Sequence, residues 1–373
     1  MPRQLMIHDV ADDGVQDRPS AIRKRAVGAV LALAVIAAIY GFVLPSIASY
    51  DDVWDTLGEM SRVETTGLVA LAGFNLWTYL PLLTSVLPGL RQRQAFVVNN
   101  SSTAVSNTMP GGGALGVAVT YTMYRSWGFS NQAIGLSVVA SGIWNNFVKL
   151  GLPIVALALL AIAGEAEASL VAASFVGVLI LAGAVLGFGL ILRSEHLAQR
   201  LGERAALIVA PVLRLGRRAA PTGWGPRAVE FRESVIDLVT DRWLRITTAT
   251  VVSHITLFFV LLIAVRNVGI SNAQVSWAAV LAAFAFGRLV SAIPVTPGGL
   301  GVIELGYVAA LSVGVGSAVE TRIVTAVLLF RAVTFIPPIA IGGFTYLFWK
   351  RNNTWRRPVN DSVPAVTDLG VPA

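Results

Sequence analysis

The long uncharged stretches of this chain constrain its fold more than any other feature. Residues 168–192 contain no charged side chain, and residues 133–163 contain only Lys149. In the hydrocarbon core of a bilayer every backbone N–H and C=O must be paired within the chain, and a continuous helix pairs them all. Only 13% of the residues are charged, against about 25% in a soluble domain. We therefore predict an all-α polytopic membrane protein.

Apolar runs of similar length recur along the chain and predict about six to eight transmembrane helices. The predicted spans lie at about residues 26–48, 66–87, 133–163, 168–192, 246–265 and 322–348. Basic residues flank these runs, and the positive-inside rule then places both termini in the cytoplasm. The same rule accounts for the net charge of +7 without a nucleic-acid partner. We predict one transmembrane domain over residues 23–350, between disordered cytoplasmic tails at residues 1–22 and 351–373.

Two apolar stretches are interrupted by proline and glycine. Residues 95–124 are broken at Met109-Pro110-Gly111-Gly112-Gly113, and residues 275–316 at Pro294-Val295-Thr296-Pro297-Gly298-Gly299-Leu300-Gly301. Each half is too short to cross a core of about 30 Å. Backbone that leaves the helix at this depth must be buried in protein or line a polar cavity. We interpret both stretches as re-entrant hairpins, with two full crossings as the alternative for residues 275–316.

The charge of the loops indicates the side from which each hairpin enters. Residues 193–245 contain ten arginines. If residues 95–124 crossed the membrane once, this basic stretch would lie outside, against the positive-inside rule. We therefore expect the first hairpin to enter from the cytoplasm and the hairpin 275–316 to enter from outside. The domain then divides into halves at 23–192 and 246–350, joined by a basic cytoplasmic connector.

The connector 193–245 has an amphipathic pattern. Its apolar residues at helical spacing are Leu197, Leu201, Ala205, Ile208, Val212 and Leu215. With a break at residues 221–223, this pattern predicts one or two amphipathic helices on the membrane surface. A docking patch for anionic lipid is one function for them, and a solvated link between the halves is the alternative.

Ionisable residues near the two breaks indicate a binding site. Paired interrupted segments of opposite polarity are typical of transporters with a site at the membrane midplane, although glycine-rich packing kinks are an alternative. Counting from the predicted boundaries puts Glu304 about 18 Å, Arg331 about 14 Å and Arg288 about 20 Å deep. Lys149, on another span, joins them. Such a surplus of bases over one acid favours an anionic ligand, unless one arginine snorkels to the surface or pairs with carbonyls.

The two hairpin tips are expected to line the same site. The tip residues are Pro294, Pro297, Gly298, Gly299 and Gly301 in the second hairpin, and Pro110, Gly111 and Gly112 in the first. Helix N-termini near Ala114 and Leu300 would supply N–H donors to an anion. The polar residues expected to line the opposite entrance are Asn99, Asn100, Ser106 and Asn107. We expect His254 to be a hydrogen-bonded structural residue.

The sequence carries no pattern of a metal or covalent catalytic centre. It has no cysteine, which removes disulfides, thiolate nucleophiles and cysteine metal sites. Asp51-Asp52 is an isolated acidic pair in a predicted loop, and no acidic cluster has metal-ligand spacing. We expect no metal, no cofactor and no catalytic group.

The motif from Pro294 to Glu304, Pro-x-x-Pro-Gly-Gly-x-Gly-Val-x-Glu, followed by Arg331, resembles a known family signature. It is similar to that of the lysylphosphatidylglycerol synthase transmembrane region family, also called the flippase-like domain. The resemblance covers about residues 26–350. It implies a multi-pass protein of the bacterial cytoplasmic (inner) membrane. In bifunctional members this region is associated with moving aminoacylated phospholipids across the bilayer.

The first half departs from the family pattern. Residues 109–116 lack the charged residues expected after the proline, and the Glu-Arg pair expected near Asn145-Asn146 is absent. Bifunctional members also carry a soluble aminoacyl-transferase domain, for which the residues after Lys350 leave no room. Aminoacyl transfer is therefore not expected, and the identity of the lipid is open.

We expect the chain to bind and translocate an anionic phospholipid or a lipid-linked phosphate. Glu304 would balance the charge of the site and take part in proton coupling. The alternatives are a membrane-embedded glycosyltransferase that acts on a lipid carrier and a non-transporting accessory protein of lipid or envelope modification.

Accessibility of residue 296 tests the second hairpin, because the chain has no native cysteine. With Thr296→Cys, a re-entrant tip should react poorly with a membrane-impermeant thiol reagent, or only through a cavity. Ready labelling from the cytoplasmic side would instead show two full crossings.

Overall fold

The structure, a computed structural model, describes residues 49–109, 111–164, 168–215, 223–292 and 296–358, together with positions 30, 34, 37, 41 and 42. This part of the chain is helical and contains no strand. The predicted tail 1–22 and most of the predicted span 26–48 lie outside it. Five of the described helical elements are long and apolar enough to cross a membrane, which confirms the predicted all-α polytopic class.

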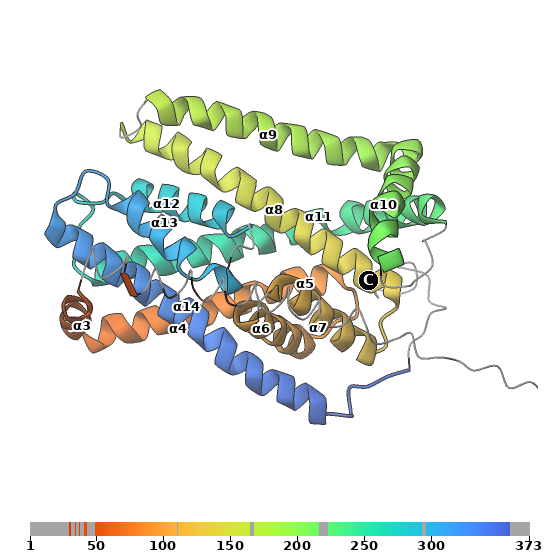
Figure 1. Cartoon of the computed structure of the whole chain (residues 1–373), viewed down its shortest axis with the longest axis horizontal. Helices are drawn as coiled ribbons and strands as arrows, with labels where there is room; N and C mark the ends of the chain where they lie inside the picture. The colour runs from red at the N-terminus through yellow and green to blue at the C-terminus, as the bar shows by residue number, and fades with distance from the viewer. Residues whose placement is uncertain are drawn as a thin grey trace, which may run out of the picture.

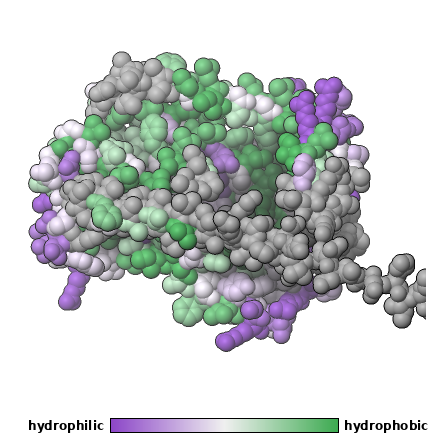
Figure 2. Space-filling view, in the orientation of Figure 1, coloured by the Kyte–Doolittle hydropathy of each residue, from purple (hydrophilic) through white to green (hydrophobic). Residues whose placement is uncertain are grey.

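The five long elements lie side by side and alternate in direction (Figure 1). They are α4 (Arg62–Thr78) with its continuation α5 (Leu80–Val86), α8 (Asn131–Ile162), α9 (Ala168–Arg193), α11 (Trp224–Asn267) and α14 (Ser317–Arg351). One end of the bundle carries α10 (Glu195–Leu215) and is called the connector end; the other carries α3 (Tyr50–Gly58) and is called the α3 end. Hydrophilic residues gather at these ends and hydrophobic residues between them (Figure 2).

The first broken segment is a helical hairpin that enters from the connector end. Its first arm, α6 (Gln92–Thr108), runs inward, and its second arm, α7 (Gly112–Ser126), returns to the same end (Figure 1). Gly111 turns the chain with a φ of +69°, a conformation that other residues rarely adopt. At the outer end the indole of Trp349, in the last turn of α14, donates a hydrogen bond to the Ser126 hydroxyl (2.8 Å).

The second broken segment is a hairpin that enters from the α3 end. It consists of α12 (Trp277–Val290), the 3-10 turn η2 (Pro297–Gly299) and α13 (Val302–Leu311). Its two helical arms are only about 21 and 15 Å long at 1.5 Å per residue, short of the roughly 30 Å of hydrocarbon. At its outer end Arg322 donates to the carbonyl of Gly269 (3.3 Å). The hairpins thus enter from opposite ends of the bundle, as predicted, and each helical arm of the second one is shorter than a full crossing.

Each hairpin packs along the long helix that follows the other one. α6 lies along α14, and α12 lies along α8. Gly342 of α14 touches α6 so closely that a Cβ there would overlap the carbonyl oxygen of Asn100. Nearby, the hydroxyls of Ser101 and Thr345 share a hydrogen bond of 2.9 Å. This crossed packing brings the two tips together near the middle of the bundle, where η2 contacts α6.

The predicted connector consists of α10 and the first part of α11. These two segments pack on each other, and a Cβ at Gly202 of α10 would overlap the carbonyl of Trp224. We expected the connector to end at residue 245, but α11 runs without interruption from Trp224 to Asn267. At about 66 Å this helix is twice the thickness of the hydrocarbon core, so its first half extends beyond the membrane.

The segment that follows α14 is packed against the first hairpin. We expected a disordered tail from residue 351, and residues 359–373 lie outside the described part. In residues 352–358, however, the Trp355 ring meets the Trp127 ring edge to face, with centroids 6.1 Å apart. The backbone N–H of Arg357 donates to the carbonyl of Ser126 (3.1 Å). These contacts tie the end of α14 to the end of α7.

The arms of the first hairpin pack closely because α7 carries glycine on the side that faces α6. A Cβ at Gly116 would lie 2.9 Å from the Ser102 carbonyl oxygen and would overlap the Ser106 hydroxyl. A Cβ at Gly112, one turn earlier, would overlap the backbone of Ser106. Small residues four apart allow such close approach of helices in membranes.

Gly116→Leu should therefore force the two arms apart. We expect a loss of about 1–3 kcal/mol of unfolding free energy from overpacking, seen as a lower melting temperature in detergent. Gly73→Leu is the matched control, because no atom lies within 4 Å of a Cβ built at Gly73. Equal melting temperatures for the two variants would show that the packing of α6 on α7 does not depend on the contact at Gly116.

Candidate functional site

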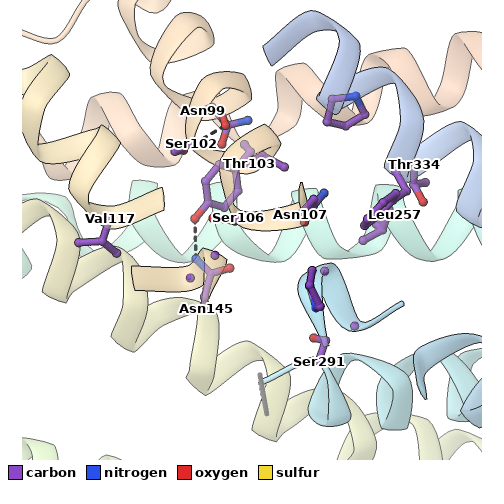
Figure 3. Close-up of a pocket in the computed structure, with 18 of the residues that line it drawn as sticks. Asn99, Ser102, Thr103, Ser106, Asn107, Val117, Asn145, Leu257, Ser291 and Thr334 are labelled. Carbon is purple, nitrogen blue, oxygen red and sulfur yellow. Dashed lines mark hydrogen bonds between the residues drawn. The ribbon is translucent and has the colours of Figure 1, made fainter. Parts of the chain in front are cut away.

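A large cavity of ≈ 1320 Å³ opens where the two hairpin tips meet. Its walls come from both hairpins and from α4, α5, α8, α11 and α14. In Figure 3, Asn107 of α6, Asn145 of α8 and Thr334 of α14 lie around one space. Its polar lining consists mainly of amides, hydroxyls and cations, whereas Val117 of α7 and Leu257 of α11 are apolar parts of the wall.

The second tip is held by a buried ion pair between α13 and α14. Arg331 Nε donates to Glu304 Oε1 at 2.5 Å, and the Glu304 side chain is fully buried. The same guanidinium donates from Nη2 to the carbonyl of Gly298 (3.0 Å) and lies over the ring of Phe335, 4.7 Å from its centroid. Glu304 is in the first turn of α13, where the helix dipole favours a carboxylate. Arg331 reaches the cavity, but Glu304 lies behind it and does not line the wall.

Arg288 contributes a second cation from the last turn of α12. Its Nη2 lies 3.4 Å from Nε2 of His254, and its Nε is buried without a hydrogen-bond partner among the described residues. Within that same part of the chain, no carboxylate is within ion-pair distance of it. Its neighbour Gly287 has no Cβ, which leaves space for the ring of Tyr307.

His254 holds Arg288 without neutralising it. His254 Nδ1 lies 2.9 Å from the carbonyl of Thr250, and a carbonyl only accepts hydrogen bonds, so Nδ1 carries the proton. Nε2 then presents its lone pair to Arg288, which requires a neutral ring. The expected structural role of His254 agrees with this geometry, and the charge of Arg288 stays uncompensated.

Lys149 contributes the third cation from the middle of α8. No hydrogen bond or ion pair joins its amine to another residue in the part of the chain that the structure describes. One turn away, the Asn145 amide donates to the Tyr79 hydroxyl (2.8 Å) and to the Ser141 carbonyl (2.9 Å). The amide and phenol thus form a neutral polar wall beside the lysine.

The predicted tip residues divide between the cavity wall and its support. The tip residues that line the cavity are Pro297, Gly298, Gly299, Gly111 and Gly112. Gly301 does not line it; with a φ of +82° it precedes the first turn of α13. Pro110 and Pro294 lie outside the described residues. The N-terminus of α7, residues 111–115, lines the cavity as expected. The N–H groups of Ala114 and Leu115 donate to the Gly111 carbonyl, which leaves those of Gly112 and Gly113 without a partner within the helix.

Three of the four polar residues predicted on α6 line the cavity: Asn99, Ser106 and Asn107. The prediction for Asn100 was wrong. Its side chain is fully buried where α6 meets α14, and its amide donates to the Phe96 carbonyl (2.9 Å). The residues lie on successive faces of a helix, so only part of a polar run can point the same way.

Several lining residues were missed from the sequence. They include Asn75, Tyr79, Tyr307 and Phe335. A signal existed for the first two: Pro81 interrupts the apolar run 66–87, and the structure divides that run into α4 and α5 at Tyr79. Tyr307 and Phe335 are aromatic residues in apolar runs and carry no distinguishing pattern. Among the described residues, no three side chains of the types that bind metals cluster together.

Comparison with known protein families gives one match. The family model described as "Lysylphosphatidylglycerol synthase TM region" matches residues 24–342. No functionally curated protein matches the chain.

The pair Glu304–Arg331 should show strong energetic coupling. Glu304→Leu or Arg331→Met alone removes the ion-pair partner of a buried charge, which costs about 3–5 kcal/mol of unfolding free energy. The double variant should recover much of that loss, because two apolar side chains leave no charge behind. The melting temperature in detergent reports the stability of the two single variants and of the double variant. Glu195→Leu is the control, because the Glu195 side chain is 70% exposed and its 3.9 Å contact with Arg232 should contribute little. Additive losses in the double variant would contradict the coupling.

Proposed function

The chain belongs to the lysylphosphatidylglycerol synthase transmembrane region family, and from this membership and the cavity we propose that it binds an anionic lipid headgroup and moves it across the bilayer. The resemblance to that family, drawn from the motif Pro294 to Glu304 followed by Arg331, is confirmed by the match over residues 24–342. The observation that carries the proposal is the cluster of three cations around one cavity: Lys149, Arg288 and Arg331.

The charge of this cavity supports an anionic ligand. Among the residues that the structure describes, only the fully buried carboxylate of Glu304 offsets the cations, and it is bound to Arg331. An uncompensated cation in a low-dielectric environment is costly, so an anion that enters the cavity is stabilised there. Arginine matches phosphate oxygens well because its guanidinium can donate two parallel hydrogen bonds.

The apolar part of the wall supports a lipid rather than a soluble anion. Met109, Leu115 and Val117 line the cavity on the side of the first tip and are 48%, 41% and 48% exposed. A lipid presents a charged headgroup and apolar chains in one molecule. The cations would hold the headgroup, and these side chains would contact the first part of the acyl or prenyl chain.

The opposed hairpins support movement of the ligand across the bilayer. In the transporters that share this arrangement, broken helices place a site midway, and the two halves rock around it. The cavity lies between the two tips and touches both of them. In this proposal the bacterial inner membrane holds the chain with its connector end in the cytoplasm, because the first turn of α6 and the last turns of α7 and α14, which lie at that end, carry Arg93, Arg125 and Lys350. The chain itself performs no catalytic step.

Reconstitution into liposomes tests the proposal. We expect the wild type to equilibrate fluorescent phosphatidylglycerol between leaflets, and Arg288→Gln to slow this by about tenfold or more because a charge-assisted contact is lost. Arg322→Gln is the control, because Arg322 binds a loop carbonyl at the α3 end and does not line the cavity.

Two results would contradict the proposal. If the wild type moves no anionic lipid, translocation is wrong. If it consumes a nucleotide sugar in the presence of a lipid carrier, the glycosyltransferase alternative replaces it.

A further inference from the structure

The described residues of the cavity carry an excess of two positive charges. Three cationic side chains line it, and one carboxylate, that of Glu304, neutralises Arg331. Three minus one leaves two, which belong to Lys149 and Arg288. Each comes from a different element, α8 and α12, and these two helices pack against each other. The two charges are therefore held near each other by the crossed packing of the halves.

The residues around these two cations do not compensate them. His254 is a neutral acceptor for Arg288, and Arg288 Nε has no acceptor in the described part of the chain. The Asn145 amide and the Tyr79 phenol near Lys149 are neutral and hydrogen-bonded to each other. No aspartate or glutamate is among the described residues that line the cavity. The compensating charge must come from the ligand.

From this balance we propose that the ligand is a lipid whose headgroup ends in a phosphomonoester or a pyrophosphate, with about two negative charges. The inference rests on the proposed function and narrows it to one substrate class. A phosphomonoester carries about −1.5 to −2 charges near neutral pH, whereas a phosphodiester such as phosphatidylglycerol carries one. Only the first of these headgroups neutralises both Lys149 and Arg288.

The same balance disfavours an aminoacylated headgroup. Lysylphosphatidylglycerol has two ammonium groups and one phosphate, so its net charge is positive. Its ammonium groups would need carboxylate or carbonyl acceptors, and the cavity offers them cations instead. The uncharged first tip agrees with this, because Gly111 and Gly112 supply backbone N–H donors, which suit an anion.

Binding to the purified full-length chain in an uncharged detergent tests the charge of the ligand. Isothermal titration would compare dioctanoyl phosphatidic acid, dioctanoyl phosphatidylglycerol and dioctanoyl lysylphosphatidylglycerol at about pH 8, where the phosphomonoester is doubly charged. We expect phosphatidic acid to bind about tenfold or more tightly than phosphatidylglycerol, with the lysyl lipid weakest. Inorganic phosphate and glycerol 3-phosphate, which lack the chains, should bind far more weakly than phosphatidic acid.

Lys149→Gln should remove the preference, because one remaining excess cation is satisfied by a single negative charge. The affinities for phosphatidic acid and phosphatidylglycerol should then approach each other. Lys350→Gln is the matched control and should keep the wild-type preference, since Lys350 is exposed at the end of α14. A test without any variant is to lower the pH to about 5, where phosphatidic acid loses its second charge. The ratio of the affinity for phosphatidic acid to that for phosphatidylglycerol should fall at this pH. Phosphatidylglycerol keeps its single charge, so its affinity at the same pH shows how much titration of the protein itself changes binding.

The failures of the two proposals differ. Equal binding of phosphatidic acid and phosphatidylglycerol by the wild type overturns the charge inference and leaves transport of an anionic lipid standing. Tightest binding of lysylphosphatidylglycerol also overturns the charge inference, and leaves transport of an aminoacylated lipid standing. Binding of inorganic phosphate as tight as that of phosphatidic acid overturns the assignment to a lipid. Absence of binding for every lipid overturns the proposed function together with this inference.

Discussion

Backbone that leaves the helix in the middle of a membrane must find its hydrogen bonds within the protein, and this requirement organises the structure. The second tip shows how it is met. Arg331 donates to the Gly298 carbonyl, and the Thr296 hydroxyl donates to the Leu300 carbonyl (2.8 Å). Arg331 is in turn held by Glu304, so the charged pair and the broken backbone stabilise each other. The long helices on either side then enclose the polar tips.

The two halves meet this requirement by different means. The second hairpin is bound to α14 through an ion pair and a cation over the Phe335 ring. The first hairpin relies on close contact: Gly116 against Ser102 and Ser106, and Gly342 against the backbone of α6. An ion pair at one tip and only neutral contacts at the other make the cavity electrostatically asymmetric. The excess positive charge of the cavity comes instead from Lys149 and Arg288, which have no carboxylate partner among the described residues.

Much of the fold and part of the site could be predicted from the sequence. Apolar runs indicate the long helices, and the breaks near Gly111 and Gly298 indicate both hairpins because glycine and proline interrupt helices for local reasons. Counting residues from the predicted membrane boundary placed Glu304, Arg331 and Arg288 at similar depths, because the rise per residue of a helix is constant. It could not show that Glu304 lies behind Arg331, that Asn100 faces α14, or that Tyr307 reaches the cavity. Those positions depend on how each helix is rotated, which packing decides.

The sequence by itself determined the class of protein, the two glycine-rich breaks and the types of charge near the middle of the membrane, because these follow from composition and local backbone preference. Only the tertiary structure decided which charges are compensated. The packing of α13 on α14 buries Glu304 against Arg331, and the packing of α12 on α8 leaves Arg288 and Lys149 facing a shared cavity. The physical reason is that Coulomb interactions depend on distance and solvent exclusion, and neither quantity exists until separate helices are brought together.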